Sequence, residues 1–338
     1  MTLILTYATP NYLLQVSDRL VTQGNAKPFD PASNKNVIYH AKNAIATIGY
    51  SGPAYIDGTT TDRWIAEKLR GEKFRDHEPG RPWALQIGRA ERWLDIGQSI
   101  ELLRRESAEV FCRLPASQRT RHHIVVAGWQ WRRRQDRFFS RPFLCEIRNG
   151  ESEAERHAFT HDQVPRYWHW APKRPAYLSS IPDQNPLSRC ELDKLKKELR
   201  SAWQSPQASV NVLIGAIRFA AQKSPTVGPD CMVVYMPMPS LRLVKAGYVA
   251  GESQQSPSAS GFSPWIVGPY SVSAPCEIVG EPDVLLGPIT VSLSGPSSVT
   301  GWPPGFPEPP DEFKSLVPNW ANSTSLLRVQ SQRRRQYP

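Results

Sequence analysis

The sequence lacks several features that would assign the chain to a broad class. Its 338 residues contain no run of about 18 apolar residues, so no transmembrane helix and no membrane association are expected. The first residues lack a basic segment, and Thr6, Thr9 and Pro10 interrupt their apolar run, so no signal peptide is expected either. The five cysteines are widely spaced and form no CxxC pair. This pattern disfavours a disulfide framework or a zinc site and indicates a reducing, cytoplasmic location.

The sequence also lacks the G-x-S-x-G pattern that places a serine nucleophile on a sharp turn. Ser107 together with His122 and His123 still leaves a Ser/His hydrolase as a competing interpretation. The two histidines open a predicted strand, where adjacent side chains point to opposite faces, so they make a poor metal site. No metal and no organic cofactor are expected.

Acidic residues are scarce around one group of arginines, and the net charge of the chain is +10. Arg132, Arg133, Arg134, Arg137 and Arg141 face only Asp136, and three more arginines occupy positions 333–335. Clustered arginines can bind phosphate or nucleic acid. No nucleic-acid-binding motif accompanies them, so a solvated loop and a disordered basic tail are favoured, and nucleic acid is not an expected partner.

The pattern of apolar residues predicts an alternation of strands and helices. Strands are expected at 2–7 and 12–16, joined by a turn at Thr9-Pro10-Asn11, and at 37–39, 44–48, 124–127, 143–147 and 231–236. A loop is expected at 22–34. Helices are expected from a cap at Thr61 or Asp62 through Leu69, and at 83–112, 189–203 and 207–222, with Pro206 between the last two. Two sheets between two helical layers would satisfy this order.

The composition changes after residue 237 and suggests three parts. Residues 1–237 contain the predicted strands and helices. Residues 238–298 alternate strand-like runs with prolines and are expected to form a β-rich extension packed on or beside the first part. Residues 299–338 are rich in proline and basic residues and are expected to be disordered.

Thr2 is the first candidate for chemistry. An initiator methionine is normally removed when the next residue is small, and Thr2 would then carry both a hydroxyl nucleophile and a free α-amine. An amino-terminal threonine activated by its own amine is a known form of nucleophilic catalysis. The alternative is that Thr2 is only the first residue of an edge strand.

Over roughly residues 2–237 the chain resembles the proteasome-like branch of the N-terminal-nucleophile hydrolases. Five segments in order carry the resemblance: Thr2 with Asp18, which is 16 positions later; Asn34 to Ile38; Ala46 to Gly52; Val125 to Gln130 with Pro142 to Gly150; and Ala216 to Tyr235. Lys35 matches the active-site lysine after a one-residue insertion in the loop 22–34. Gln130 stands where the family has an aspartate.

The resemblance implies an α+β fold, the four-layer αββα sandwich, to which the composition adds a Pro/Ser-rich C-terminal extension. It implies that Thr2 attacks an amide or ester carbonyl, that Asp18 holds Lys35 as a cation nearby, and that the turn with Gly49, Ser51 and Gly52 supplies an oxyanion-hole amide. The family has a second aspartate on its last turn. Ser224 takes that place here, with Thr226 adjacent, so the amine would lose a negative neighbour.

The function predicted from the sequence is a cytoplasmic threonine peptidase or amidohydrolase that cleaves an amide bond after Met1 is removed. Its substrate would be a peptide or another amide, and the resemblance implies a homo-oligomer. The alternative is a catalytically inactive, proteasome-like assembly or binding protein that uses the loop Arg132–Arg141 to contact an acidic partner.

Overall fold

The computed structural model of the chain describes most of residues 2–279 and one strand beyond them. The described residues are 2–9, 11–22, 27–30, 33–74, 85–87, 89–115, 119–134, 137–150, 155, 158–164, 177–181, 186–237, 243–249, 260–269, 271–273, 275–279 and 289–292.

The first sheet has six strands and contains both strands of the hairpin predicted near Thr9. Its strands, in spatial order, are β13 (Tyr177–Ile181), β1 (Ile4–Ala8), β2 (Tyr12–Asp18), β14 (Cys231–Pro237), β15 (Leu243–Val249) and β20 (Ile289–Ser292). The Thr9 hydroxyl accepts a hydrogen bond from the Tyr12 amide at 3.0 Å, which closes the β1–β2 turn. The predicted hairpin is confirmed.

The second sheet has eight strands and is built around the predicted pair near residues 37–48. In spatial order they are β12 (Phe159–Val164), β11 (Arg137–Asn149), β10 (His123–Arg134), β6 (Ala44–Ser51), β5 (Asn36–Ala41), β17 (Trp265–Val267), β18 (Ser271–Ser273) and β9 (Leu85–Ile87). The described residues also form three two-stranded sheets: β3 (Val21–Thr22) with β4 (Pro28–Asp30), β7 (Tyr55–Ile56) with β8 (Thr59–Thr60), and β16 (Ser260–Ser263) with β19 (Cys276–Val279).

Four helices are described, and three of them begin directly after a residue whose side chain caps the first turn. They are α1 (Thr61–Arg70), α2 (Ile96–Arg113), α3 (Arg189–Ala202) and α4 (Pro206–Lys223). Asp95 and Gln98 form a capping box at the start of α2, and Ser188 and Glu191 form one at the start of α3.

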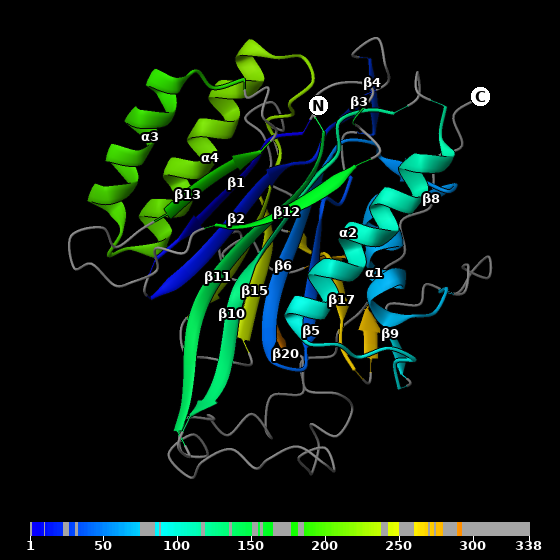
Figure 1. The fold of residues 1–338 in the computed structure, drawn as a ribbon. Coiled ribbons are helices and arrows are strands. Elements are labelled where there is room, and N and C mark those ends of the chain that lie inside the picture. Colours follow the sequence, from blue (N-terminus) through cyan, green and yellow to red (C-terminus); the bar gives the residue numbers. More distant parts are fainter. Residues whose placement is uncertain are drawn as a thin grey trace.

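One helix pair packs on each sheet, and the two sheets pack on each other (Figure 1). Helices α3 and α4 bury leucines such as Leu199 and Leu213 against Leu5 and Leu14 of the first sheet. Helices α1 and α2 bury their apolar faces on the second sheet. Between the sheets lies a third apolar cluster that includes Trp129. The α+β class predicted from the sequence is confirmed.

The predicted helix boundaries need three corrections. The helix expected at 83–112 begins only at Ile96, because the Asp95 capping box starts it, and residues 85–87 form strand β9 instead. The N-cap of α1 is Thr60 rather than Thr61 or Asp62. Pro206 is the first residue of α4 and does not separate the helices, because proline is compatible with the first helical position.

Two segments predicted as loops contain strands. The segment 22–34 includes β4, which pairs with β3. The arginine-rich segment lies on the β10–β11 hairpin, where Arg132 is opposite Phe139 and Arg134 is opposite Arg137. The predicted tail, 299–338, lies outside the described residues.

Strands from beyond residue 237 join both sheets. Strand β15 pairs with β14 in the first sheet, and β17 pairs in parallel with β5 in the second. Cys112, Cys145, Cys190 and Cys231 form no disulfide within the described part of the chain. Among the helices that the structure describes, none combines the length and apolar character needed to span a bilayer.

Candidate active site

Asp18 is the centre of the candidate site and ends strand β2. Its side chain is fully buried, so its oxygens have to be satisfied within the protein. Oδ1 accepts a hydrogen bond from the Leu3 amide at 2.8 Å, and Oδ2 accepts from the amides of Leu20 at 3.1 Å and Gly228 at 3.2 Å. These amides precede β1, follow β2 and follow α4. A single carboxylate therefore joins three distant parts of the chain.

Lys35 supplies the charge that balances Asp18. It lies directly before β5 with a side chain only 1% exposed, and its Nζ is 2.9 Å from Asp18 Oδ2. The same Nζ donates to the carbonyl oxygen of Leu20 at 2.5 Å. Burial lowers the pKa of Lys35 below its ordinary value, and the Asp18 carboxylate limits that fall. The two side chains form a buried ion pair, in which removal of either partner would leave an uncompensated charge.

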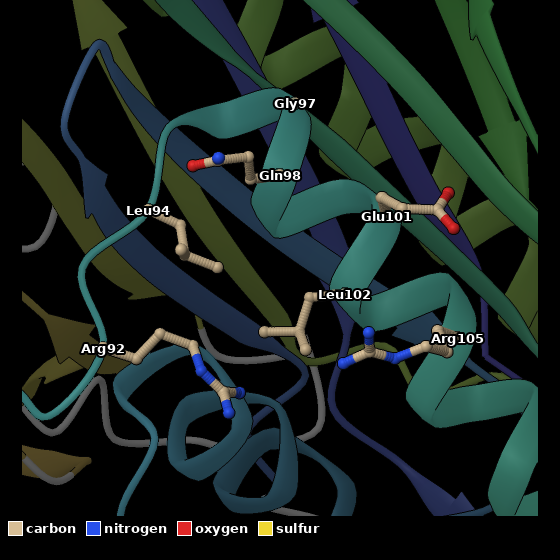
Figure 2. Close-up of a pocket in the computed structure, with 7 residues that line it drawn as sticks. All are labelled: Arg92, Leu94, Gly97, Gln98, Glu101, Leu102 and Arg105. Atoms are coloured by element: carbon tan, nitrogen blue, oxygen red, sulfur yellow. The ribbon is translucent and has the colours of Figure 1, made fainter.

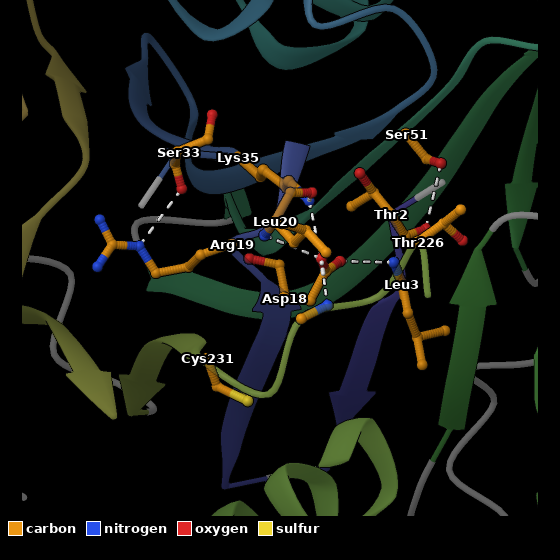
Figure 3. Close-up of polar contacts among 12 residues, drawn as sticks. Thr2, Leu3, Asp18, Arg19, Leu20, Ser33, Lys35, Ser51, Thr226 and Cys231 are labelled. Atoms are coloured by element: carbon orange, nitrogen blue, oxygen red, sulfur yellow. Dashed lines mark hydrogen bonds and ion pairs between the residues drawn. The ribbon is translucent and has the colours of Figure 1, made fainter. Parts of the chain in front are cut away.

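Thr2 directly precedes Leu3, whose backbone amide donates to Asp18 of this ion pair (Figure 3). Its carbonyl oxygen accepts a hydrogen bond from the Ser51 hydroxyl at 3.2 Å. The next residue, Leu3, exchanges two bonds with Asp18, because its amide donates to the carboxylate and its carbonyl accepts from the Asp18 amide at 3.1 Å. The structure therefore brings together four residues predicted from the sequence: Thr2, Asp18, Lys35 and Ser51.

Gly49 and Gly52 lie in different surroundings. Gly49 lies inside β6, which runs on to Ser51, so the glycine turn predicted to begin at residue 49 starts later. A Cβ at Gly49 would come within 3.0 Å of atoms of Asn36 and Ile4. Gly52 has a φ of +132°, and a Cβ there would lie 2.6 Å from the Arg121 carbonyl oxygen. Gly52 is therefore the glycine that the turn itself requires.

Ser224 and Thr226 lie on the turn after α4 and bond to each other. Their hydroxyl oxygens are 2.8 Å apart. The same turn is tied to the site by Gly228, whose amide donates to Asp18. Residues 224–228 contain no carboxylate, so the turn brings hydroxyl groups and no negative side chain.

No protein-family model matches the chain, and no curated protein sequence matches it. Two solved structures that resemble it are both named Anbu. The Anbu (Gly-1) mutant from Hyphomicrobium sp. strain MC1 is 8% identical, with a TM-score of 0.44 over 75% of this chain and 90% of that one. Anbu (ancestral beta-subunit) from Yersinia bercovieri is 10% identical, with a TM-score of 0.37 over 71% of this chain and 83% of that one.

The competing Ser/His interpretation is wrong for the described residues. Ser107 is buried in α2, and its hydroxyl has no hydrogen-bond partner among them. The His122 ring stacks on Phe111 at 5.4 Å between centroids, and burial lowers the pKa of His122 to about 3, so it stays neutral. His123 lies 3.7 Å from a carboxylate oxygen of Glu146. Within the part of the chain that the structure describes, no three His, Cys, Asp or Glu side chains gather as a metal site would require.

A hollow of about 520 Å³ lies elsewhere, beside the first half of α2 (Figure 2). Leu94 and Leu102 form its apolar part, and Arg92, Glu101 and Arg105 form its charged part. None of the residues predicted for the active site lines this hollow.

Sequence reasoning assigned no role to three contributors to the site. The Leu20 carbonyl accepts from Lys35, and a backbone acceptor leaves no signal in residue type. Asn34 and Asn36 flank Lys35, and both side chains are buried and hydrogen-bonded. The sequence shows an asparagine on each side of Lys35, but the burial that makes both side chains hydrogen-bonding partners is visible only in the structure.

Proposed function

We propose that this chain is a proteasome-like hydrolase that cleaves an amide bond with Thr2 as its amino-terminal nucleophile, once Met1 has been removed. The main support is the buried Asp18–Lys35 pair, which the Leu3 amide joins to the residue after Thr2. The packing of helices on two stacked sheets agrees with the four-layer αββα sandwich, which we propose as the architecture. The proposal includes a cytoplasmic homo-oligomer that acts on a peptide or other amide without metal or cofactor.

In the proposed reaction the Thr2 hydroxyl oxygen attacks the substrate carbonyl carbon. Its proton passes to the α-amine of the same residue, or to a water beside it, and then to the leaving amine. Water hydrolyses the resulting ester and restores the hydroxyl. Lys35, held by Asp18, is the cation that lowers the pKa of the hydroxyl and the amine. A backbone amide of the turn Ser51–Gly52 stabilises the oxyanion, and loss of one such donor typically costs about 3 kcal/mol.

The turn after α4 limits the rate of this reaction. Ser224 and Thr226 bring hydroxyls in place of a carboxylate, so no acid on that turn stabilises the charged amine. We therefore expect a slow amidase rather than an efficient peptidase.

Intact-mass analysis and covalent labelling test this proposal. Purified protein should lack Met1, and a β-lactone probe should add one equivalent to Thr2. The variants Thr2→Ala and Lys35→Ala should lose labelling, whereas Lys42→Ala, which changes an exposed lysine in the β5–β6 turn, should label like the unchanged chain. Complete retention of Met1, or equal labelling of Thr2→Ala, would contradict the proposed function.

A second candidate function is binding to an acidic partner, and the register of the β10–β11 hairpin favours it. In that register Arg134 pairs with Arg137, and Arg132 and Arg141 lie further along the same two strands. The pairing therefore gathers four arginine positions on one hairpin. In Figure 1 the two strands extend beyond the neighbouring strands of their sheet.

Salt-dependent binding tests this second candidate. The chain should bind heparin, a sulfated polyanion, with an affinity that falls steeply as salt rises. Arg132→Ala and Arg134→Ala together should weaken binding about tenfold, since each removes a positive charge from the same hairpin. Arg105→Ala, an exposed arginine on α2, is the matched control. An unchanged affinity in the double variant would rule out a role for the hairpin arginines.

A further inference from the structure

A buried carboxyl group accepts a hydrogen bond from the residue that precedes the lysine of the candidate site. Asp62, in the first turn of α1, is only 5% exposed. No ion pair includes it within the described part of the chain. Burial raises its pKa, and hydrogen bonds from the side chains of Thr60 and Asn34 and from the Arg63 backbone oppose that rise. A buried acid without a cation lowers stability, so a role outside stability would account for it.

The hydrogen bonds of Asp62 lead directly to the segment that carries Lys35. Asn34 Nδ2 donates to Asp62 Oδ2 at 2.7 Å and also to the Asn36 carbonyl oxygen at 2.9 Å. Asn34 and Asn36 are the residues on either side of the lysine. The Asn34 amide therefore bridges the backbone around Lys35, and Asp62 fixes the orientation of that amide.

Tyr50 joins the same segment to the strand of the oxyanion turn. Its hydroxyl donates to the Asn34 carbonyl oxygen at 3.1 Å, and its amide donates to the Lys35 carbonyl oxygen at 3.4 Å. Tyr50 is buried and directly precedes Ser51. Asp62, Asn34 and Tyr50 thus form one buried cluster between the lysine segment and the turn at Ser51–Gly52.

We propose that Asp62 is a positioning residue, which acts through Asn34 and Tyr50 to fix the Lys35 ammonium relative to the turn Ser51–Gly52. The catalytic consequence rests on the proposed function, whereas the placement of Lys35 does not. A role limited to the helix dipole of α1 would predict a change in stability only. A positioning role also predicts a change at Lys35 and at Thr2.

Two variants and one control test the cluster. Asp62→Asn replaces one acceptor oxygen with a donor that faces other donors, and Tyr50→Phe removes the hydroxyl that bonds to the Asn34 carbonyl and to the Asp62 backbone. The control Asp57→Asn removes an acid that is 54% exposed in the turn just before α1. Both cluster variants should slow β-lactone labelling of Thr2 about tenfold and shift the midpoint of its pH profile, because a small displacement of a catalytic group costs much of the rate. Asp57→Asn should stay within about twofold.

Acetylation of lysines provides a readout that does not need activity. Acetic anhydride should modify exposed Lys42 quickly and buried Lys35 slowly in the unchanged chain, as read by peptide mass. Asp62→Asn and Tyr50→Phe should raise the acetylation of Lys35 about fivefold and leave Lys42 unchanged, since burial controls access. If the unchanged chain fails to label at Thr2, the proposed function fails, and acetylation still decides whether Asp62 fixes the placement of Lys35.

Unchanged labelling of Thr2 and unchanged protection of Lys35 in both variants would overturn the proposal. If Asp62→Asn does not fold, Tyr50→Phe alone provides the test.

Discussion

At the scale of single residues, the site depends on charges that are buried together. Asp18 receives three backbone amides and one ammonium group, all inside the protein. A pair of this kind stabilises a fold only while both partners are present. Its position where three chain segments cross is that of a group that fixes a geometry rather than adds to stability.

Removing Lys35 should therefore lower the free energy of unfolding, by an amount that depends on whether Asp18 is present. Lys35→Met keeps most of the aliphatic stem but leaves the carboxylate buried and unpaired, which should lower the free energy of unfolding by about 3–5 kcal/mol in urea denaturation. In the double variant Asp18→Asn/Lys35→Met the loss should be smaller than the sum of the two single losses. Lys42→Met should change stability by less than about 0.5 kcal/mol. Additive single losses would show that the two side chains do not interact.

His122 should make the stability depend on pH. Its pKa is about 3 in the folded chain and ordinarily 6.5, because burial disfavours the charged ring. Below about pH 6.5 the unfolded chain therefore binds a proton that the folded chain does not. The free energy of unfolding should fall by up to about 1.4 kcal/mol per pH unit on going down toward pH 3.

Comparison with a variant isolates this contribution from the other titrating groups near the ring, which are His123 and, beside it, Glu146. Urea denaturation at several pH values gives the slope of the unfolding free energy against pH. In His122→Leu this slope should be shallower by up to about 1.4 kcal/mol per pH unit, which corresponds to one proton. Equal slopes in the two proteins would mean that His122 is not the buried neutral group described.

At the scale of elements, two neighbouring strands of the second sheet approach each other at a place where only glycine fits. This place is Gly128 of β10. A Cβ there would lie 2.0 Å from the Ile45 carbonyl oxygen and 2.7 Å from the Ala46 Cα. Both neighbours are backbone atoms of β6, so no side-chain rotation relieves the overlap. The close approach of β6 and β10 thus depends on this position.

Gly128→Ala should lower the free energy of unfolding by about 3 kcal/mol or more, because the strands have to move apart. Gly215→Ala, on α4, is the matched control. Nothing lies within 4 Å of its added methyl group, and alanine favours the helix by about 1 kcal/mol. Thermal unfolding of the two variants should move in opposite directions. A stabilised Gly128→Ala variant would show that β6 and β10 are not packed this closely.

Local signals in the sequence predicted the elements whose determinants are local. The Thr9 turn predicted the β1–β2 hairpin, and the Asn36 to Ser51 region predicted β5 and β6. The start of α2 was missed because apolar periodicity outweighed a capping box at Asp95 that was present in the sequence.

Partners distant in sequence were harder to predict. Asp18 and Lys35 were paired from the resemblance, and the structure pairs them. The contact between Asn34 and Asp62 depends on how α1 lies against β5, which no local pattern encodes. The same holds for the parallel pairing of β17 with β5, which joins residues more than 200 positions apart.

At the scale of the whole molecule, the segment after residue 237 completes both sheets. Strand β15 covers the edge of β14, and β17 covers the edge of β5. Trp265 of β17 also stacks on Phe74, with ring centroids 5.0 Å apart. Both edges would otherwise present unpaired backbone groups, which are a common route to aggregation.

Truncation after Pro237 should therefore disable the rest of the chain. The shortened protein exposes two apolar strand edges and loses the packing of Trp265 on the second sheet, so we expect aggregation in size-exclusion chromatography and loss of a single cooperative urea transition. The full-length variant Trp265→Phe keeps the strands and most of the ring packing and should remain cooperative, at a cost below about 1.5 kcal/mol. A truncated protein that stays monomeric and unfolds in one sharp transition would show that residues 1–237 fold independently. The later strands would then be an accessory to a complete domain rather than part of its sheets.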